Sequence, residues 1–346
     1  MARISKAAGL TAAILALLSV AAACGGSGSG LFAINPEDGS ARKVAGGCIE
    51  TFAWSPDGRR IAYSTSGGEL SAVEFVDGEV RERRRLADSA AGPSWSPDGS
   101  KVGFVAMLRI VHGQQVSTDG ALIVVDFDSG SAKRIDTGVG AWPPAAWSPD
   151  GRLIAFHADP GLSIWVTTPE GKSRRSVTEG GVSAPAWFPD GRRIIYSGHD
   201  SDAATNVLKI VATDGTGLRR LGTADEFGFY VPPVSPDGSR LAYATRDAIF
   251  LVNADGSGKR RITSAAGLVD WWSGSAIPVI LAWSPRGDRI AWVAAGSGRW
   301  GLYTVHADGS GKHLLAEFSQ ARVSPPEWSA GGLAIAVESG ACIPED

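Results

Sequence analysis

The chain has 346 residues, a formal net charge of −3 and a hydrophobic content of 44%. This length accommodates one large repeat domain or two ordinary domains, and the weak charge gives no electrostatic reason to expect nucleic-acid binding. The 45 glycines and 12 tryptophans favour a fold with many turns and large aromatic packing units, which is typical of an all-β repeat protein.

The first 23 residues have the pattern of an export signal and are not expected to belong to the fold. Arg3 and Lys6 precede an uncharged run, and small residues lead directly to Cys24. This pattern resembles a bacterial lipoprotein signal, which implies cleavage before Cys24, lipid on Cys24 and a place on the outer side of a bacterial membrane. Residues 24–30 then form a Gly/Ser tether. An ordinary secretory signal with an incidental cysteine is the alternative, and the apolar run is short for a membrane-spanning helix.

Residues 31–346 are predicted to form one domain, which begins with a strand pair. Leu31 to Ile34 and Ala41 to Val44 flank an Asn-Pro-Glu-Asp-Gly turn. No tryptophan turn precedes this pair, whereas each later repeat starts with one. The pair therefore resembles the second half of the repeats that follow it.

A tryptophan-type position followed by a tight turn recurs every 40 to 52 residues, a period that indicates a repeat architecture. Proline presets φ at the second turn position, aspartate tolerates the third and glycine suits the fourth, so each copy predicts a β-hairpin. The copies are Trp54-Ser-Pro-Asp-Gly58, Trp95-Ser-Pro-Asp-Gly99, Trp147-Ser-Pro-Asp-Gly151, Trp187-Phe-Pro-Asp-Gly191, Val234-Ser-Pro-Asp-Gly238, Trp283-Ser-Pro-Arg-Gly287 and Trp328-Ser-Ala-Gly-Gly332.

Each complete repeat contains four strands, and six complete repeats run from Cys48 to about Phe318. The seventh has only its first two strands, from Arg322 to Glu338. The N-terminal pair supplies the missing third and fourth strands. The sequence therefore predicts an all-β, seven-bladed β-propeller with four-stranded antiparallel blades, one of which is shared between the two ends of the chain.

Two cysteines remain after the predicted cleavage. Cys48 follows the N-terminal strand pair and Cys342 follows the C-terminal pair, so both should lie at the shared blade. An exported protein can form disulfides, and we expect a Cys48–Cys342 bond. Two free thiols are the alternative.

The Trp-Ser-Pro-Asp-Gly repeats, with the later Asp-Gly turn and basic strand, resemble the TolB-like (WD-repeat-like) propeller family of bacterial envelope proteins. Members of this family include periplasmic docking proteins, solute-binding or lyase domains and the gating half of serine peptidases. The resemblance covers residues 31 to 342 and implies the fold rather than one activity. The turn departs from its pattern at Arg286 and at Ala330-Gly331.

The sequence offers no catalytic residues and no cofactor or metal site that repeats cannot explain. A serine peptidase needs a Gly-x-Ser-x-Gly elbow in a hydrolase domain, and the Gly/Ser run at residues 26–30 lies in the tether. His112, His157 and His199 fall near the ends of second strands, where they could meet at the axis. Polar residues at strand ends are the simpler interpretation.

Five long segments are predicted on the face opposite the tight turns: Leu108–Gly120, Gly138–Pro144, Gly198–Thr205, Thr223–Pro233 and Ser264–Pro278. Three of them carry aromatic residues, and exposed aromatics on loops held by a rigid scaffold suggest a binding surface. The candidate binding residues are Trp142, Phe227, Phe229, Tyr230, Trp271 and Trp272. The alternative is that these rings cap their own hydrophobic cores.

We therefore expect a monomeric, lipid-anchored, extracytoplasmic propeller that binds an envelope protein or glycan without catalysis. It would meet the membrane through its lipid alone and bind no nucleic acid. The second hypothesis is a saccharide lyase or hydrolase with its site at the axial mouth of the propeller. Clustered acidic or histidine side chains at that mouth would favour the enzyme.

Overall fold

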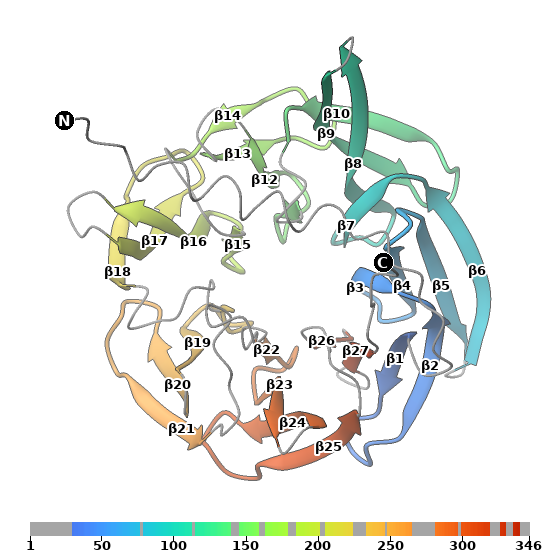
Figure 1. The fold of residues 1–346 in the computed structure, drawn as a ribbon. Helices are drawn as coiled ribbons and strands as arrows, with labels where there is room; N and C mark the ends of the chain where they lie inside the picture. The colour runs from blue at the N-terminus through green and yellow to red at the C-terminus, as the bar shows by residue number, and fades with distance from the viewer. Residues whose placement is uncertain are drawn as a thin grey trace, which may run out of the picture.

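The structure is a computed structural model that describes thirteen segments of the chain. These are residues 30–76, 79–112, 115–139, 145–158, 163–178, 185–200, 205–223, 233–245, 248–264, 281–296, 299–318, 326–329 and 335–339. Within them the chain forms antiparallel sheets arranged around a central axis, as a β-propeller (Figure 1). No helix of the described segments is long and apolar enough to cross a membrane.

Six sheets of the described part have four strands, and each is one blade. The first blade after the N-terminal pair contains β3 (Ile49–Trp54), β4 (Arg60–Thr65), β5 (Leu70–Val76) and β6 (Glu79–Ala87). The next contains β7 (Ala90–Trp95), β8 (Lys101–His112), β9 (Gln115–Asp126) and β10 (Ala132–Thr137). The third contains β11 (Ala146–Trp147), β12 (Ile154–Ala158), β13 (Ser163–Thr167) and β14 (Arg175–Ser176).

The later blades follow the same order from the axis outward. One contains β15 (Ala186–Trp187), β16 (Arg193–Asp200), β17 (Thr205–Ala212) and β18 (Arg219–Thr223). A three-stranded sheet of β19 (Arg240–Ala244), β20 (Ala248–Asn253) and β21 (Arg260–Ser264) comes next. It is followed by β22 (Ala282–Trp283), β23 (Arg289–Gly296), β24 (Arg299–His306) and β25 (His313–Phe318).

The predicted shared blade is confirmed. Its strand order is β2-β1-β27-β26, formed by β1 (Gly30–Ile34), β2 (Ala41–Gly46), β26 (Glu327–Trp328) and β27 (Ile335–Ser339). β1 pairs antiparallel with β27 from Gly30↔Ser339 to Ile34↔Ile335. The two ends of the described chain therefore close the ring through main-chain hydrogen bonds.

The expectation of seven four-stranded blades is not met, because the described residues form six. In the sheet β19–β21 the innermost position has only an isolated bridge between Val234 and Leu241. Val234 follows Pro233, which has no backbone N–H to donate, so a regular ladder cannot continue toward the start of this segment. The Pro233 carbonyl still accepts a hydrogen bond from the Ala242 N–H at 3.2 Å.

The hydrophobic core lies between neighbouring blades. One cluster joins Ile249 and Leu251 of β20 to Trp283, Ile290 and Trp292 of the following blade. Trp292 has no exposed surface. Since each sheet packs both its faces in this way, strands in the middle of a blade, such as β12 and β20, are largely apolar and buried on both sides.

The Ser-Pro-Asp-Gly turns are held by a repeated set of hydrogen bonds. In the first copy the Ser55 hydroxyl donates to Asp57 at 2.6 Å and accepts from the Arg60 N–H at 2.8 Å. Gly58 has a φ of 69°, which favours glycine. In the copy with Arg286 in place of aspartate, the serine hydroxyl still donates to a carboxylate. The acceptor is now Asp288, at 2.7 Å from the Ser284 hydroxyl. The departure at Arg286 therefore leaves this turn intact.

Two expected long loops are largely strand. β8 and β9 pair from Lys101↔Asp126 to His112↔Gln115, so most of the segment 108–120 is a β-hairpin. It extends beyond the ring in Figure 1. The segment 198–205 is shortened in the same way, because β16 continues to Asp200 and β17 starts at Thr205. Ile110, Val111 and Val116 favour extended structure in the first segment. In the second, the ladder that starts at Arg193↔Ala212 continues to Asp200↔Thr205.

Candidate functional site

The innermost strands surround the propeller axis, and tryptophan indoles connect them. In four blades the indole Nε1–H donates to a carbonyl of the preceding blade, one residue before that blade's own Trp position. The pairs are Trp95 to Ala53 at 3.1 Å, Trp187 to Ala146 at 3.0 Å, Trp283 to Pro233 at 3.1 Å and Trp328 to Ala282 at 3.1 Å. The tryptophans thus pack between blades, as expected from their repetition.

The position just before each tryptophan faces the neighbouring blade, and it has a small or apolar residue in every copy except the last. The series is Ala53, Ser94, Ala146, Ala186, Pro233, Ala282 and Glu327. Sequence reasoning missed Glu327, although aligning the repeats on their tryptophans would have found it. A half-buried carboxyl in this uncharged series is the most unusual residue of the inner ring.

Glu327 makes the contact between the last and the first innermost strands. Its Oε2 accepts a hydrogen bond from the Trp54 backbone N–H at 3.1 Å. The Trp54 indole nitrogen, like that of Trp147, is buried and has no partner among the described residues, so the indole bond seen in four other blades is absent here. Burial raises the pKa of the Glu327 carboxyl to about 7, although the backbone hydrogen bond from Trp54 opposes this rise.

A second carboxyl lies on the adjacent innermost strand. Glu50 is the second residue of β3, and although the residue is exposed, partial loss of water around its carboxyl raises the pKa of that group. Glu50 and Glu327 are the charged residues of the innermost strands in the described part of the chain. Carboxyls with a raised pKa are candidates for proton transfer or for ligand contacts.

The predicted binding residues lie outside the described residues. This holds for Trp142, Phe227, Phe229, Tyr230, Trp271 and Trp272, and for the proposed lipidation site Cys24. Their place on one surface stays a prediction.

The predicted disulfide is described at one end only. Cys48 is 5% exposed and is bonded in a disulfide. Its expected partner, Cys342, lies outside the described residues, so the pairing stays a prediction.

The histidines do not form a metal site in the described part of the chain. His157 is buried at the end of β12, where it pairs with Ile164. No group of three or more His, Cys, Asp or Glu side chains comes together there. The side chains of His112 and His199 are outside the described set.

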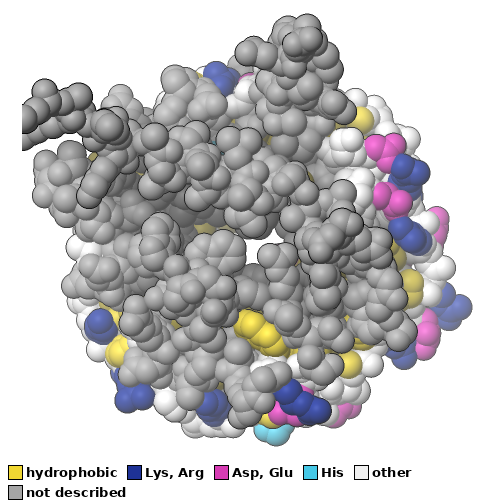
Figure 2. Space-filling view, in the orientation of Figure 1, with side chains coloured by type: hydrophobic (Ala, Val, Ile, Leu, Met, Phe, Trp, Pro, Cys, Tyr) yellow, Lys and Arg dark blue, Asp and Glu magenta, His cyan; other side chains and the backbone are white. Residues whose placement is uncertain are grey.

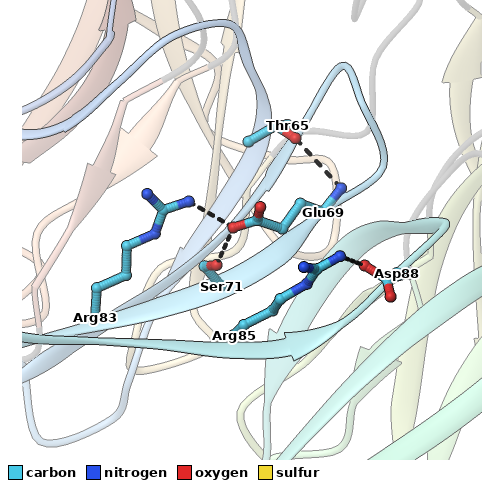
Figure 3. Close-up of polar contacts among 6 residues, drawn as sticks. All are labelled: Thr65, Glu69, Ser71, Arg83, Arg85 and Asp88. Carbon is cyan, nitrogen blue, oxygen red and sulfur yellow. Dashed lines mark hydrogen bonds and ion pairs between the residues drawn. The ribbon is translucent and has the colours of Figure 1, made fainter.

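The outer surface has many charges of both signs, and several of them pair with one another. On β6 the Arg83 guanidinium binds Glu69 at 2.5 Å, and Arg85 binds Asp88 (Figure 3). Glu69 also accepts from the Ser71 hydroxyl at 2.6 Å. In Figure 2, basic and acidic side chains alternate along the rim on the side of β5 and β6. This mixed rim does not favour a polyanion as ligand.

Other basic side chains of the outer strands link neighbouring blades. The guanidinium of Arg219 donates to the Ala254 carbonyl at 2.6 Å. Arg260 donates to the carbonyls of Ala307 at 2.8 Å and Asp308 at 2.9 Å. Sequence reasoning missed these inter-blade bonds because the partners lie 35 or more residues away in the chain.

Comparison with known proteins agrees with this architecture. Over 293 residues the chain is 26% identical to an uncharacterised protein of Agrobacterium fabrum, covering 68% of this chain and 95% of that one. It is 27% identical to the Tol-Pal system protein TolB of Francisella tularensis, with coverage of 69% of this chain and 54% of the relative. The chain thus spans about half the length of those TolB proteins.

A solved structure with a similar fold is an oligogalacturonate lyase of Vibrio parahaemolyticus. It has a TM-score of 0.58 and 14% identity, and covers 86% of this chain and 80% of that one. At this identity the likeness shows the fold alone. The family model described as the TolB beta propeller domain matches residues 47–276, which is more than half of the 346 residues. The chain therefore belongs to the TolB β-propeller family.

Proposed function

We propose that this protein is an exported, lipid-anchored propeller that binds an envelope protein through the face opposite its Ser-Pro-Asp-Gly turns. An envelope glycan is the second candidate ligand. In this proposal the propeller is monomeric and has seven blades, with Val234 in the innermost position of the sheet β19–β21. Family membership carries the proposal, because relatives of this chain are named for the Tol-Pal system.

Export and anchoring rest on the N-terminal sequence. A basic start, an uncharged run and small residues lead to Cys24, and the Gly/Ser tether separates Cys24 from β1 at Gly30. Replacing Cys24 with Ser should move the protein from the membrane fraction to the soluble extracytoplasmic fraction. Unchanged membrane retention of the Cys24→Ser variant would contradict lipid anchoring.

The binding face is supported by where the described strands end. β18 ends at Thr223 and β21 ends at Ser264, and both ends lie on the face opposite the tight turns because strand direction alternates within a blade. The segments that join them to the next innermost strands contain Phe227, Phe229, Tyr230, Trp271 and Trp272. A buried aromatic anchor often contributes about 2 kcal/mol or more to a complex.

A pull-down from detergent-solubilised envelope tests this face. Trp271→Ala/Trp272→Ala should weaken capture of the partner by more than about tenfold, as expected for the loss of an aromatic anchor. The matched control is Leu218→Ala. Leu218 is 57% exposed and lies in the turn before β18, on the opposite face. Full capture by the double variant, or equal loss in the control, would contradict the proposal.

The alternative function is a saccharide lyase or hydrolase at the axial mouth. It is favoured by Glu50 and Glu327, two carboxyls with raised pKa on adjacent innermost strands, and by the fold shared with an oligogalacturonate lyase. Incubation with acidic oligosaccharides, followed by detection of unsaturated or shortened products, tests it. Product formation that is lost in Glu327→Gln would replace the binding proposal with this one.

A further inference from the structure

Cationic side chains of one blade bind the next blade at six junctions of the ring. In each case a basic residue of the outermost strand reaches the turn or strand start of the following blade. The pairs are Arg42 with Glu79, Arg84 with the Asp128 carbonyl, Lys133 with the Glu170 carbonyl, Arg175 with the Thr213 carbonyl, Arg219 with the Ala254 carbonyl and Arg260 with the carbonyls of Ala307 and Asp308.

The junction between β25 and the shared blade lacks this contact in the described residues. β14, β18 and β21 begin with Arg175, Arg219 and Arg260, and β25 begins with His313 at the same register position. Leu251↔Arg260 and Thr304↔His313 are the equivalent pairs. Histidine is shorter than arginine and has no guanidinium group. The neighbouring cation Lys312 reaches back to the Ser264 carbonyl at 2.9 Å instead.

A pocket of about 220 Å³ lies at this junction. It is lined by Pro36 and Glu37 from the β1–β2 turn, Arg289 from β23, and His306 and His313. This volume exceeds the roughly 30 Å³ that one water occupies in the liquid, so the pocket can accommodate a side-chain head group. We call it the seam pocket.

The β1–β2 turn presents the same acceptors that bind cations elsewhere in the ring. Gly39 N–H bonds the Asn35 carbonyl at 2.8 Å, as Gly130 N–H bonds the Asp126 carbonyl at 2.9 Å. The Glu37 carbonyl therefore occupies the place of the Asp128 carbonyl, which accepts from Arg84. No described side chain donates to the Glu37 carbonyl. The Glu37 carboxylate is 71% exposed and adds a negative charge to the pocket.

The guanidinium of Arg289 does not exclude a second cation. It is paired with the Glu37 carboxylate at 3.4 Å. Arg240 holds the equivalent place at the start of β19, and in that blade Arg260 still binds the next turn. At that junction an arginine at the start of the second strand and an arginine bound to the next turn are therefore both present.

We propose that the seam pocket binds an arginine side chain presented by a partner protein. The guanidinium group takes the place that Arg260 fills within the chain at the preceding junction. Planar guanidinium donors match paired carbonyl and carboxylate acceptors better than an ammonium group does. The seam pocket lies on the face of the tight turns, so this contact is separate from the binding face proposed above.

The test uses N-acetyl-arginine amide as the probe, and its neutral isostere N-acetyl-citrulline amide as the matched ligand control. We expect saturable changes in the NMR ring signals of His306 and His313 with the arginine probe, and at least about tenfold weaker binding of citrulline, as expected for loss of a charged hydrogen-bond donor. Glu37→Gln should weaken binding. His313→Arg should abolish it, because the new guanidinium fills the pocket from within the chain.

The preceding junction supplies an internal control. Arg260→Ala should open a second site, detected as a second saturable phase that perturbs His306. Equal binding of citrulline, unchanged arginine binding in His313→Arg with its fold intact, or ring signals that respond to inorganic phosphate but not to the arginine probe would overturn the proposal. Partner binding at the face opposite the tight turns is measured separately, by the pull-down from solubilised envelope. Either proposal can therefore fail without the other.

Discussion

Removing the charge of Glu327 should make the stability of the propeller less sensitive to pH. The pKa of this carboxyl is raised from 4.5 to about 7 in the folded chain, because the group is buried at the contact between β26 and β3. A raised folded pKa means that the folded state holds the proton more tightly. The corresponding stability is fully present below about pH 4.5 and is lost as the pH rises through 7.

The size of this effect follows from the two pKa values. One unit corresponds to about 1.4 kcal/mol, so a rise from 4.5 to about 7 sets an upper limit of about 3 kcal/mol. Glu327 is half-buried, and partial contact with water screens its charge, so we expect roughly 1 to 2 kcal/mol. In the Glu327→Gln variant the side-chain amide oxygen would still accept the hydrogen bond from the Trp54 N–H, and the group would be neutral at every pH.

Urea denaturation at pH 5 and pH 8.5 measures the effect. At pH 5 the variant and the natural protein should have similar free energies of unfolding, because Glu327 is protonated. At pH 8.5 the variant should be the more stable of the two. Glu317→Gln, on the exposed outer strand β25, controls for removing a carboxylate in general. A variant whose stability difference from the natural protein is the same at both pH values would refute this account.

Three further predictions concern the turns and the disulfide of Cys48. Hydrogen bonds from Ser96 and Ser235 lower the pKa values of Asp98 and Asp237 to about 2, so their contribution, present above about pH 4, should be lost as the pH falls toward 2. Thermal melts of Asp98→Asn/Asp237→Asn between pH 2 and 5 should vary less than those of the natural protein. Cys48→Ser should cost roughly 2–5 kcal/mol, measured by urea denaturation without reductant. Asp288→Ala should cost about 1 kcal/mol in the same assay, and Arg286→Ala should cost little, because the Ser284 hydroxyl donates to Asp288 and not to Arg286.

The turn positions of the fold were predictable because their physics is local. Proline, aspartate and glycine at fixed offsets specify a hairpin, and the recurring tryptophan sets the period at which blades repeat. The closure through β1 and β27 was also predictable, since the incomplete last repeat needed the strands that the N-terminal pair provides. The number of complete four-stranded blades was harder to predict. The proline before Val234 disrupts the innermost ladder of one sheet, and the turn motif that follows Val234 gives no sign of this.

The candidate sites depended on contacts between residues far apart in the chain. Glu327 and Trp54 are 273 residues apart, and only ring closure brings them together. The same holds for Arg289 and Glu37 in the seam pocket. Sequence reasoning selected exposed aromatics on loops, whereas the described chemistry lies at positions where one repeat differs from the others, as His313 differs from Arg219 and Arg260.

The placement of β1 has a mechanical consequence for the proposed anchoring through the N-terminal tether. β1 lies between β2 and β27, and it pairs with each of them over five residues. A pulling force applied at Gly30 acts along the strand, while the hydrogen bonds of an antiparallel ladder run across it. Both ladders are therefore loaded in shear, so their hydrogen bonds share the load instead of opening one after another. β1 should therefore resist such tension better than a strand whose hydrogen bonds open one after another from a sheet edge.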